Sequence, residues 1–141
     1  RLERTRYEAE TAYISDYQEL TNNQAAKTGI YEYADYCSSG LKAGWLGQSE
    51  SNDLQWRDVY SHKGGKYELT IAYISGENRT MAVDVNGRRV QTISVSSGSC
   101  NTVAKKTVSI QLKKGHNTIR LSNATGWMPD IDYIDVRPVF Q

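Results

Sequence analysis

Apolar and polar residues alternate along much of this chain in short runs that end at turn residues. The clearest run covers residues 66–74, where Tyr67, Leu69, Ile71 and Tyr73 occupy every second position. Successive side chains of a β-strand point to opposite faces, so this spacing predicts a strand with one apolar face. No long helical pattern is present, and a mainly β structure is therefore expected.

A β-hairpin is predicted around the dipeptide Asn86-Gly87. This dipeptide separates two β-rich runs, residues 80–85 and 89–95. Both residues tolerate the positive φ that a type I′ turn requires, which makes Asn-Gly a strong hairpin signal.

The remaining strands are shorter or less regular. They are predicted at residues 6–12, 42–46, 53–59, 107–112, 117–121 and 131–136, and a short helical turn is possible within residues 22–29. Short strands separated by regular turns indicate an all-β fold, an antiparallel β-sandwich. A chain of 141 residues suits one core. We therefore expect a charged linker at residues 1–5 and one domain at residues 6–141.

Charge and composition narrow the classes of function. The 17 basic and 16 acidic residues nearly cancel, which argues against nucleic acid as a partner. No apolar run approaches membrane-spanning length, so no membrane partner is expected. No signal peptide is visible, so either it was removed or the chain is part of a longer protein. The second is favoured, since the charged start is expected to be linker within a longer, secreted protein. The 10 tyrosines and 3 tryptophans against 1 phenylalanine favour aromatic groups at wet surfaces, although tyrosine is also common in exposed sheets.

The two cysteines, Cys37 and Cys100, both lie in segments rich in serine and glycine. Two loop cysteines in a secreted domain predict a disulfide, and a pair of free thiols is the alternative. No Cys-x-x-Cys or Cys/His spacing indicates zinc.

Catalysis is not expected. The two histidines, His62 and His116, lie in turns rich in glycine and lysine, and no motif places a nucleophile beside them. Pairs of carboxylates leave a glycosidase dyad open as an alternative. A small domain of short strands rarely encloses a deep catalytic cleft, so a binding function is favoured.

Residues 123–136 are the most informative segment for binding. The segment is predicted to begin as a polar loop that holds Trp127 and to end as a strand that carries Asp130 and Asp132 on one face. An exposed aromatic ring beside oriented polar groups is suited to binding a sugar. The hydroxyls of that sugar would be bound by Asp130, Asn123 or Asn101.

The three tryptophans differ in their surroundings. Trp56 shares a strand face with Leu54 and is expected in the core. Trp45 is flanked by glycine-containing sequence and is expected to be partly open. Trp127 lies in a loop that Pro129 stiffens. Trp45 and Trp127 are therefore the candidate sugar platforms.

A metal site is also predicted. Glu8 and Glu10 project from one side of the first strand, and Asp132 shares the parity of the apolar residues Ile134 and Val136. An inward carboxylate needs a partner, and calcium prefers several oxygen ligands. A hydrogen-bonded or protonated carboxylate network, or solvated glutamates on an edge strand, are the alternatives.

Taken in order, these motifs resemble the carbohydrate-binding module superfamily that includes families 6 and 35. The similarity is greatest to family 35 modules attached to α-galactosidases and related glycoside hydrolases. It covers residues 7–10, 37–47, 52–59, 65–71, 85–87, 115–121 and 127–134.

The resemblance implies a jelly-roll sandwich that binds poly- or oligosaccharide without catalysis, as a monomeric module of a secreted glycoside hydrolase. It implies a structural calcium held by Glu8, Glu10 and Asp132, and a loop site that contains Trp45. Galactose-containing glycans are the first expectation. A structural β-sandwich that packs on the catalytic domain without binding sugar is the alternative.

Two departures from the family pattern affect the expected site. Asp130 replaces the usual asparagine before the last strand, which should disfavour uronic acids through charge repulsion unless a second calcium intervenes. Cys100 lies in a loop where many family 6 members carry a tryptophan, so Trp127 is expected to supply that platform. A Cys37–Cys100 bridge would then brace two loops beside the site.

Overall fold

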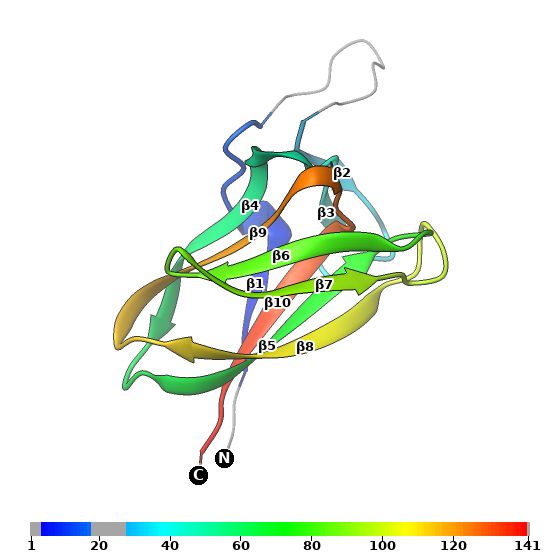
Figure 1. Cartoon of the computed structure of the whole chain (residues 1–141). Helices are drawn as coiled ribbons and strands as arrows, with labels where there is room; N and C mark the ends of the chain where they lie inside the picture. The colour runs from blue at the N-terminus through cyan, green and yellow to red at the C-terminus, as the bar shows by residue number, and fades with distance from the viewer. Residues whose placement is uncertain (1–3, 18–27, 141) are drawn as a thin grey trace.

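The computed structural model describes residues 4–17 and 28–140, which form two antiparallel β-sheets packed face to face (Figure 1). One sheet has the order β2-β3-β10-β5-β8, with β1 also paired to β10, and the other has the order β4-β9-β6-β7. The strands of the first sheet are β1 (Thr5–Glu8), β2 (Ile30–Tyr33), β3 (Leu41–Gly44), β10 (Asp130–Pro138), β5 (Gly65–Ile74) and β8 (Ala104–Leu112). Those of the second are β4 (Gly47–Ser61), β9 (Gly115–Trp127), β6 (Arg79–Val85) and β7 (Arg88–Val95). The predicted all-β jelly-roll sandwich is confirmed.

The core lies between the two sheets and is formed by the predicted apolar faces. Leu69 and Ile71 of β5 are fully buried, as are Leu121 of β9 and Ile134 of β10. Trp56 is 3% exposed, so its predicted place in the core is confirmed. Burial of these side chains is the main stabilising contribution to the sandwich.

The predicted hairpin is present between β6 and β7. Asn86 and Gly87 have φ values of 51° and 81°, as a type I′ turn requires. The two strands then pair from Val85 and Arg88 outward.

The structure differs from the prediction at several elements, among them β3, which ends at Gly44, and β4, which already begins at Gly47. β1 ends at Glu8, because Ala9 turns inward and begins a 3-10 helix, Ala9–Thr11. β2 was not predicted. β9 continues beyond the predicted residues 117–121, since its polar end still pairs with β4. Trp127 therefore ends a strand and does not lie in a loop.

The predicted boundary between the linker, residues 1–5, and the domain also differs slightly from the structure. Arg4 forms an ion pair with Asp135, with Nε and Oδ2 3.2 Å apart, and Thr5 already belongs to β1. Residues 1–3 of the expected linker, and most of the expected helical turn at 22–29, lie outside the described residues. The described part of the chain contains no helix that is long and apolar enough to cross a membrane.

The predicted Cys37–Cys100 disulfide is absent, and both thiols are free. Cys37 is buried against Ile74, whereas Cys100 is exposed and its Sγ faces Gly76 on another loop. The two loops are still neighbours, because the Tyr36 hydroxyl donates a hydrogen bond of 3.2 Å to the Cys100 carbonyl oxygen. The Tyr36 side chain thus joins the loops, while the two thiols point to different surroundings.

Candidate functional site

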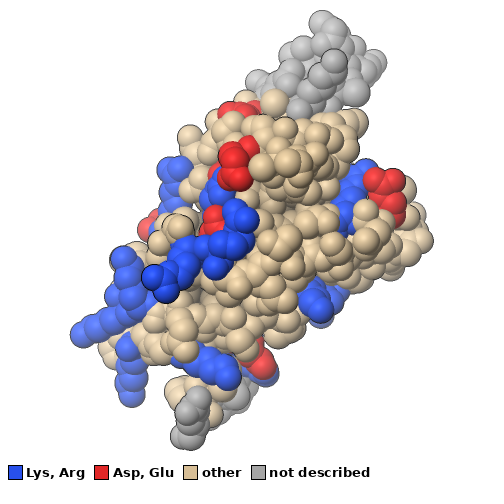
Figure 2. All heavy atoms as spheres, viewed as in Figure 1, with Lys and Arg blue, Asp and Glu red and all other residues tan. Residues whose placement is uncertain are grey.

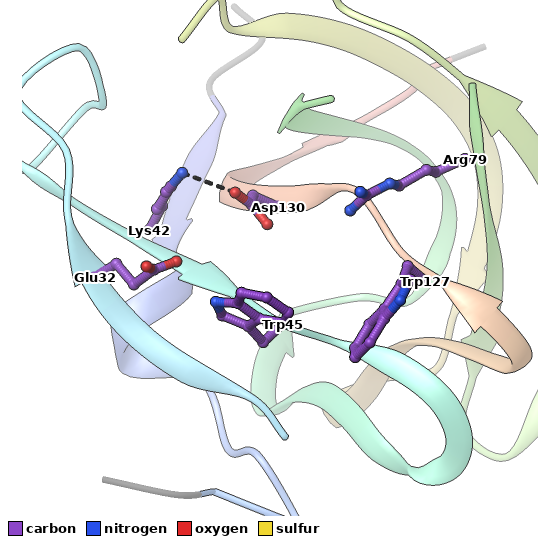
Figure 3. Close-up of a pocket in the computed structure, with 6 residues that line it drawn as sticks. All are labelled: Glu32, Lys42, Trp45, Arg79, Trp127 and Asp130. Carbon is purple, nitrogen blue, oxygen red and sulfur yellow. Dashed lines mark hydrogen bonds and ion pairs between the residues drawn. The ribbon is translucent and has the colours of Figure 1, made fainter. Parts of the chain in front are cut away.

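An open hollow of about 290 Å³ lies where β3 leads into β4 and β9 leads into β10. Side chains from both sheets line it, as Figure 3 shows. They are Glu32, Lys42, Trp45, Arg79, Trp127 and Asp130. Three of the predicted sugar-binding residues are therefore brought together, although they are separated by up to 85 positions in the sequence.

Trp45 and Trp127 form a corner on one side of the hollow. Their ring centroids are 5.5 Å apart and their planes meet at 84° (Figure 3). This edge-to-face arrangement is a favourable one for two aromatic rings. It leaves 38% of Trp45 exposed, so part of its surface is available to a ligand.

The backbone at Trp45 is held in an unusual conformation. Its φ is 57°, in the left-handed region that costs a residue with a side chain about 1–2 kcal/mol. The buried Asn52 holds this turn, because its Nδ2 donates 2.8 Å hydrogen bonds to the carbonyl oxygens of Trp45 and Gly47. Its Oδ1 accepts a third bond, of 2.6 Å, from the Gly29 amide.

The Trp45 turn also packs tightly on the strand that carries Trp127. A Cβ on Gly47 would lie 2.4 Å from the Gly126 carbonyl oxygen, so only glycine fits there. The Met128 amide donates a 2.9 Å hydrogen bond to the Leu46 carbonyl oxygen. Both sides of the aromatic corner are therefore fixed by the same backbone contacts.

The predicted ligand residue Asn123 does not line this hollow. Its Nδ2 donates to the Thr80 carbonyl oxygen at 2.9 Å, and its Oδ1 accepts from the amides of Thr125 and Gly126 at 3.1 and 3.0 Å. These bonds shape the end of β9 just before Trp127. Asn123 therefore positions the ring.

Asn101 also lies outside the hollow. It is exposed in the loop that follows β7, and its Oδ1 accepts a 2.8 Å hydrogen bond from the Ser99 hydroxyl.

The floor of the hollow contains an ion pair. Lys42 Nζ lies 2.7 Å from Asp130 Oδ2 and donates a 2.9 Å hydrogen bond to the Tyr36 hydroxyl. Burial lowers the pKa of Lys42, but the bonds to Asp130 and Tyr36 outweigh this, so the pKa is raised above its ordinary value. Asp130 is therefore a paired carboxylate and not the isolated negative charge that the sequence suggested.

Two further groups complete the polar lining. Burial, and then the charge of Asp130, raise the pKa of Glu32 above its ordinary value. A Cβ on Gly44 would lie 2.4 Å from Glu32 Oε1, so glycine makes room for this carboxylate. Arg79 donates a 3.2 Å hydrogen bond through Nη1 to the Met128 carbonyl oxygen and pairs with Glu77. The hollow thus offers acceptors and donors beside two aromatic rings.

Glu32, Lys42 and Arg79 were not assigned to the site from the sequence. Glu32 lies on the strand that was not predicted. Lys42 and Arg79 lie at ordinary strand positions, where a cation is normally solvated. The only available signal was that Lys42 lies three positions before Trp45 within the motif that resembles the family.

The residues predicted to bind calcium lie near one another, where β1 pairs with β10. A bulge between Ile131 and Tyr133 removes Asp132 from the strand register. Asp132 is 2% exposed and accepts hydrogen bonds of 3.0 and 3.1 Å from the Ser38 amide. Ser38 also donates through its hydroxyl to Glu8 Oε2 at 2.8 Å.

The chemistry of these carboxylates fits a hard cation. Glu8 Oε1 and Glu10 Oε1 are buried and have no hydrogen-bond partner. Burial raises the pKa of Asp132 to about 6, and the charges of Glu8 and Glu10 add to this rise against the opposing Ser38 amide. In the described part of the chain, no three acidic, histidine or cysteine side chains are grouped as a metal site. The carboxylate donors fit calcium. In this structure Asp132 and Glu8 are hydrogen-bonded to Ser38.

A β-sandwich with a rigid aromatic corner and a polar floor in an open end hollow defines the class of carbohydrate-binding modules. The chain belongs to carbohydrate-binding module family 35, whose family model matches residues 5–139. This family is non-catalytic, in agreement with the prediction from sequence.

Individual relatives agree with this membership. The chain is 33% identical over 135 residues to a cycloisomaltooligosaccharide glucanotransferase of Niallia circulans, covering 92% of this chain and 12% of that enzyme. A family 35 module from Clostridium thermocellum has the same fold, with a TM-score of 0.83 and 24% identity over 95% of this chain and 98% of that one. A Phanerochaete chrysosporium exo-β-1,3-galactanase crystallised with galactose has a TM-score of 0.72 and 25% identity over 95% of this chain and 29% of that one.

Proposed function

We propose that this module binds one ring of an uncharged glycan in the hollow between Trp45 and Trp127. The observation that carries this proposal is the aromatic corner, held rigid at an energetic cost in the Trp45 backbone. Strain at a surface residue persists only where the surrounding structure maintains it, and it is concentrated at functional positions. A core would gain nothing from this arrangement.

The lining supports a sugar ligand through two kinds of contact. The C–H face of a sugar ring packs on an indole, while its hydroxyls bond to Asp130 and Glu32 as acceptors and to Lys42 and Arg79 as donors. Two carboxylates and two cations leave the floor without net charge, which favours an uncharged sugar. A volume of about 290 Å³ lies at the lower end of ligand pockets, so the hollow suits a single ring.

Galactose-containing glycans are the proposed ligands. The axial hydroxyl of galactose leaves a continuous C–H patch on one ring face, which fits an indole. A galactanase also carries a related domain. Isomaltooligosaccharides are the second candidate, favoured by the name of the 33% identical relative.

The module is further proposed to hold a glycan-active enzyme on its polysaccharide outside the cell. The chain spans only 12% of the glucanotransferase that it matches, which supports a role as one part of a larger enzyme. Tethering raises the local concentration of substrate around a catalytic domain. Single-site affinity is expected to be weak, because an open hollow buries little of a ligand.

We also propose a structural calcium at Glu8, Glu10 and Asp132. It would satisfy the buried glutamate oxygens and neutralise three neighbouring carboxylates. Its chemical contribution would be to stabilise the fold, as a ligand that binds only the native state does.

Affinity electrophoresis tests the sugar proposal. The wild-type chain should be retarded by galactan, and less by dextran, whereas Trp45→Ala should migrate as in a gel without polysaccharide. Tyr60→Ala is the matched control, since Tyr60 is an exposed aromatic (53%) that lies outside the hollow. Retardation by dextran alone would select the second candidate. Equal retardation of wild type and Trp45→Ala would refute the site. No retardation of wild type by either polysaccharide would favour a structural domain without a sugar ligand.

A further inference from the structure

A patch of lysines lies at the end of the sandwich where the β4–β5 and β8–β9 turns meet. We define this lysine patch as Lys63, Lys66, Lys113 and Lys114, all exposed. The two turns are adjacent, because a Cβ on Gly64 would lie 2.9 Å from the Lys114 amide nitrogen. In Figure 2 the Lys and Arg spheres gather at the lower left, where Figure 1 shows these turns.

The patch carries most of the charge asymmetry of the chain. The whole chain has a net charge of +1, so the remainder without these four lysines carries −3. None of the four side chains forms an ion pair within the described residues. Asp58, in β4, lies 3.6 Å from His116 and forms no ion pair with these lysines in the described part of the chain.

Buried polar residues hold the two turns in place. Asn117 is 1% exposed, and its Nδ2 donates to the carbonyl oxygens of Lys113 and Gly115 at 3.0 and 3.1 Å. Its Oδ1 accepts a 2.9 Å bond from the Lys113 amide. In the other turn, the buried Ser61 hydroxyl accepts a 2.8 Å bond from the Gly64 amide. The lysines are therefore presented from an ordered backbone.

An apolar hollow is lined in part by two of these lysines, Lys63 and Lys66. It has a volume of about 410 Å³ and is lined by residues 62–67 of the β4–β5 turn and by residues 138–140, including Val139 and Phe140. Phe140 is 67% exposed, and the Val139 amide donates a 2.9 Å hydrogen bond to the Lys66 carbonyl oxygen. The combination of an exposed ring and surrounding cations suits a ligand with ring faces and repeated anionic groups.

We infer that the lysine patch binds an anionic polysaccharide, at a site separate from the tryptophan hollow. Lysine ammonium groups bind carboxylate or sulfate as point charges, and the apolar hollow accepts the face of a sugar ring. A protein partner is less favoured, because protein interfaces are depleted in lysine and enriched in arginine. This inference does not depend on the proposed function of the hollow.

Affinity electrophoresis with polygalacturonate at low salt is the direct test, with its methyl ester as the uncharged matrix. Wild type should be retarded by polygalacturonate only, and raised salt should remove the effect, since screening acts over about 10 Å at 0.1 M. The variant Lys113→Gln/Lys114→Gln should bind about 25-fold more weakly, at roughly five-fold per lysine. The control Lys105→Gln/Lys106→Gln makes the same charge change at exposed positions elsewhere on β8 and should bind as wild type.

Several outcomes would reject the inference. The first is that wild type is not retarded by polygalacturonate at low salt. The second is that both double variants lose the same amount of retardation. The third is that Trp45→Ala loses retardation, which would place binding in the tryptophan hollow. Retardation by polyaspartate but not by polygalacturonate would instead indicate an acidic protein as partner. Thermal melts should be unchanged in both double variants, because all four substituted side chains are exposed.

Discussion

Replacement of Asn52 by alanine tests how the fold places Trp45. Asn52 is 2% exposed and makes three hydrogen bonds, to the amide of Gly29 and to the carbonyl oxygens of Trp45 and Gly47. Alanine would leave three buried backbone groups without their partner. The left-handed conformation of Trp45 would then lose the contacts that maintain it.

The expected magnitude follows from these three groups. A buried polar group left unsatisfied costs about 1–3 kcal/mol. Taking the low end, because water enters near a surface turn, Asn52→Ala should lower the free energy of unfolding by about 3 kcal/mol. For a domain of this size that corresponds to a fall in Tm on the order of 10 °C. Sugar affinity should fall on the order of ten-fold, because the relaxed turn moves Trp45 away from Trp127.

Chemical denaturation and isothermal titration with a galactan oligosaccharide measure the two effects. Asn52→Asp provides a partial variant, since a carboxylate still accepts from the Gly29 amide but cannot donate to either carbonyl. Asn101→Ala is the control, since this exposed asparagine should change stability by less than about 0.5 kcal/mol. If Asn52→Ala kept both wild-type stability and wild-type affinity, the explanation of the Trp45 conformation would be wrong.

Three other predictions concern separate parts of the molecule. A chelator should lower Tm, and Glu8→Gln/Glu10→Gln should abolish that shift; a Tm that is indifferent to chelator would count against the calcium proposal. A maleimide should label the exposed Cys100 rapidly and Cys37 only after unfolding. Burial, followed by the charge of Asp132, raises the pKa of Cys37 to about 12. No labelling of either thiol in the folded protein would instead indicate a disulfide. Asp130→Asn should destabilise the fold by about 1 kcal/mol, because Lys42 would lose the negative charge of its partner and keep only neutral acceptors. An unchanged denaturation midpoint would show that the ion pair contributes nothing.

The elements governed by local rules were predicted well. The period-two run that became β5 and the Asn86-Gly87 hairpin depend only on neighbours in sequence. The core position of Trp56 follows from the same alternation. These features need no knowledge of what packs against them.

The site could be predicted only in part, because it depends on contacts between distant segments. Trp45, Trp127 and Asp130 carry recognisable chemistry, whereas Lys42 becomes a site residue only through its pairing with Asp130, 88 positions away. The left-handed turn at Trp45 could not be foreseen, since neither glycine nor asparagine occupies that position. The role of Asn123 was likewise set by a backbone carbonyl on another strand, that of Thr80.

The cysteines show the limit of compositional reasoning. Two cysteines in serine-rich loops satisfy the usual rule for a secreted domain, and the loops do meet. A disulfide also requires the two Cβ vectors to converge, and this orientation is not encoded in the spacing along the chain. Burial of Cys37 against Ile74 decides its direction instead.

Binding of galactan oligosaccharides by wild type, Trp45→Ala and Trp127→Ala, measured by isothermal titration, tests the central claim most directly. Each tryptophan lines the hollow, and truncation of an aromatic side chain that dominates a binding site costs about 2 kcal/mol or more. Affinity should therefore fall by roughly 30-fold or more in each variant, with both variants still folded. Binding of the same strength by all three proteins would contradict a sugar site between Trp45 and Trp127.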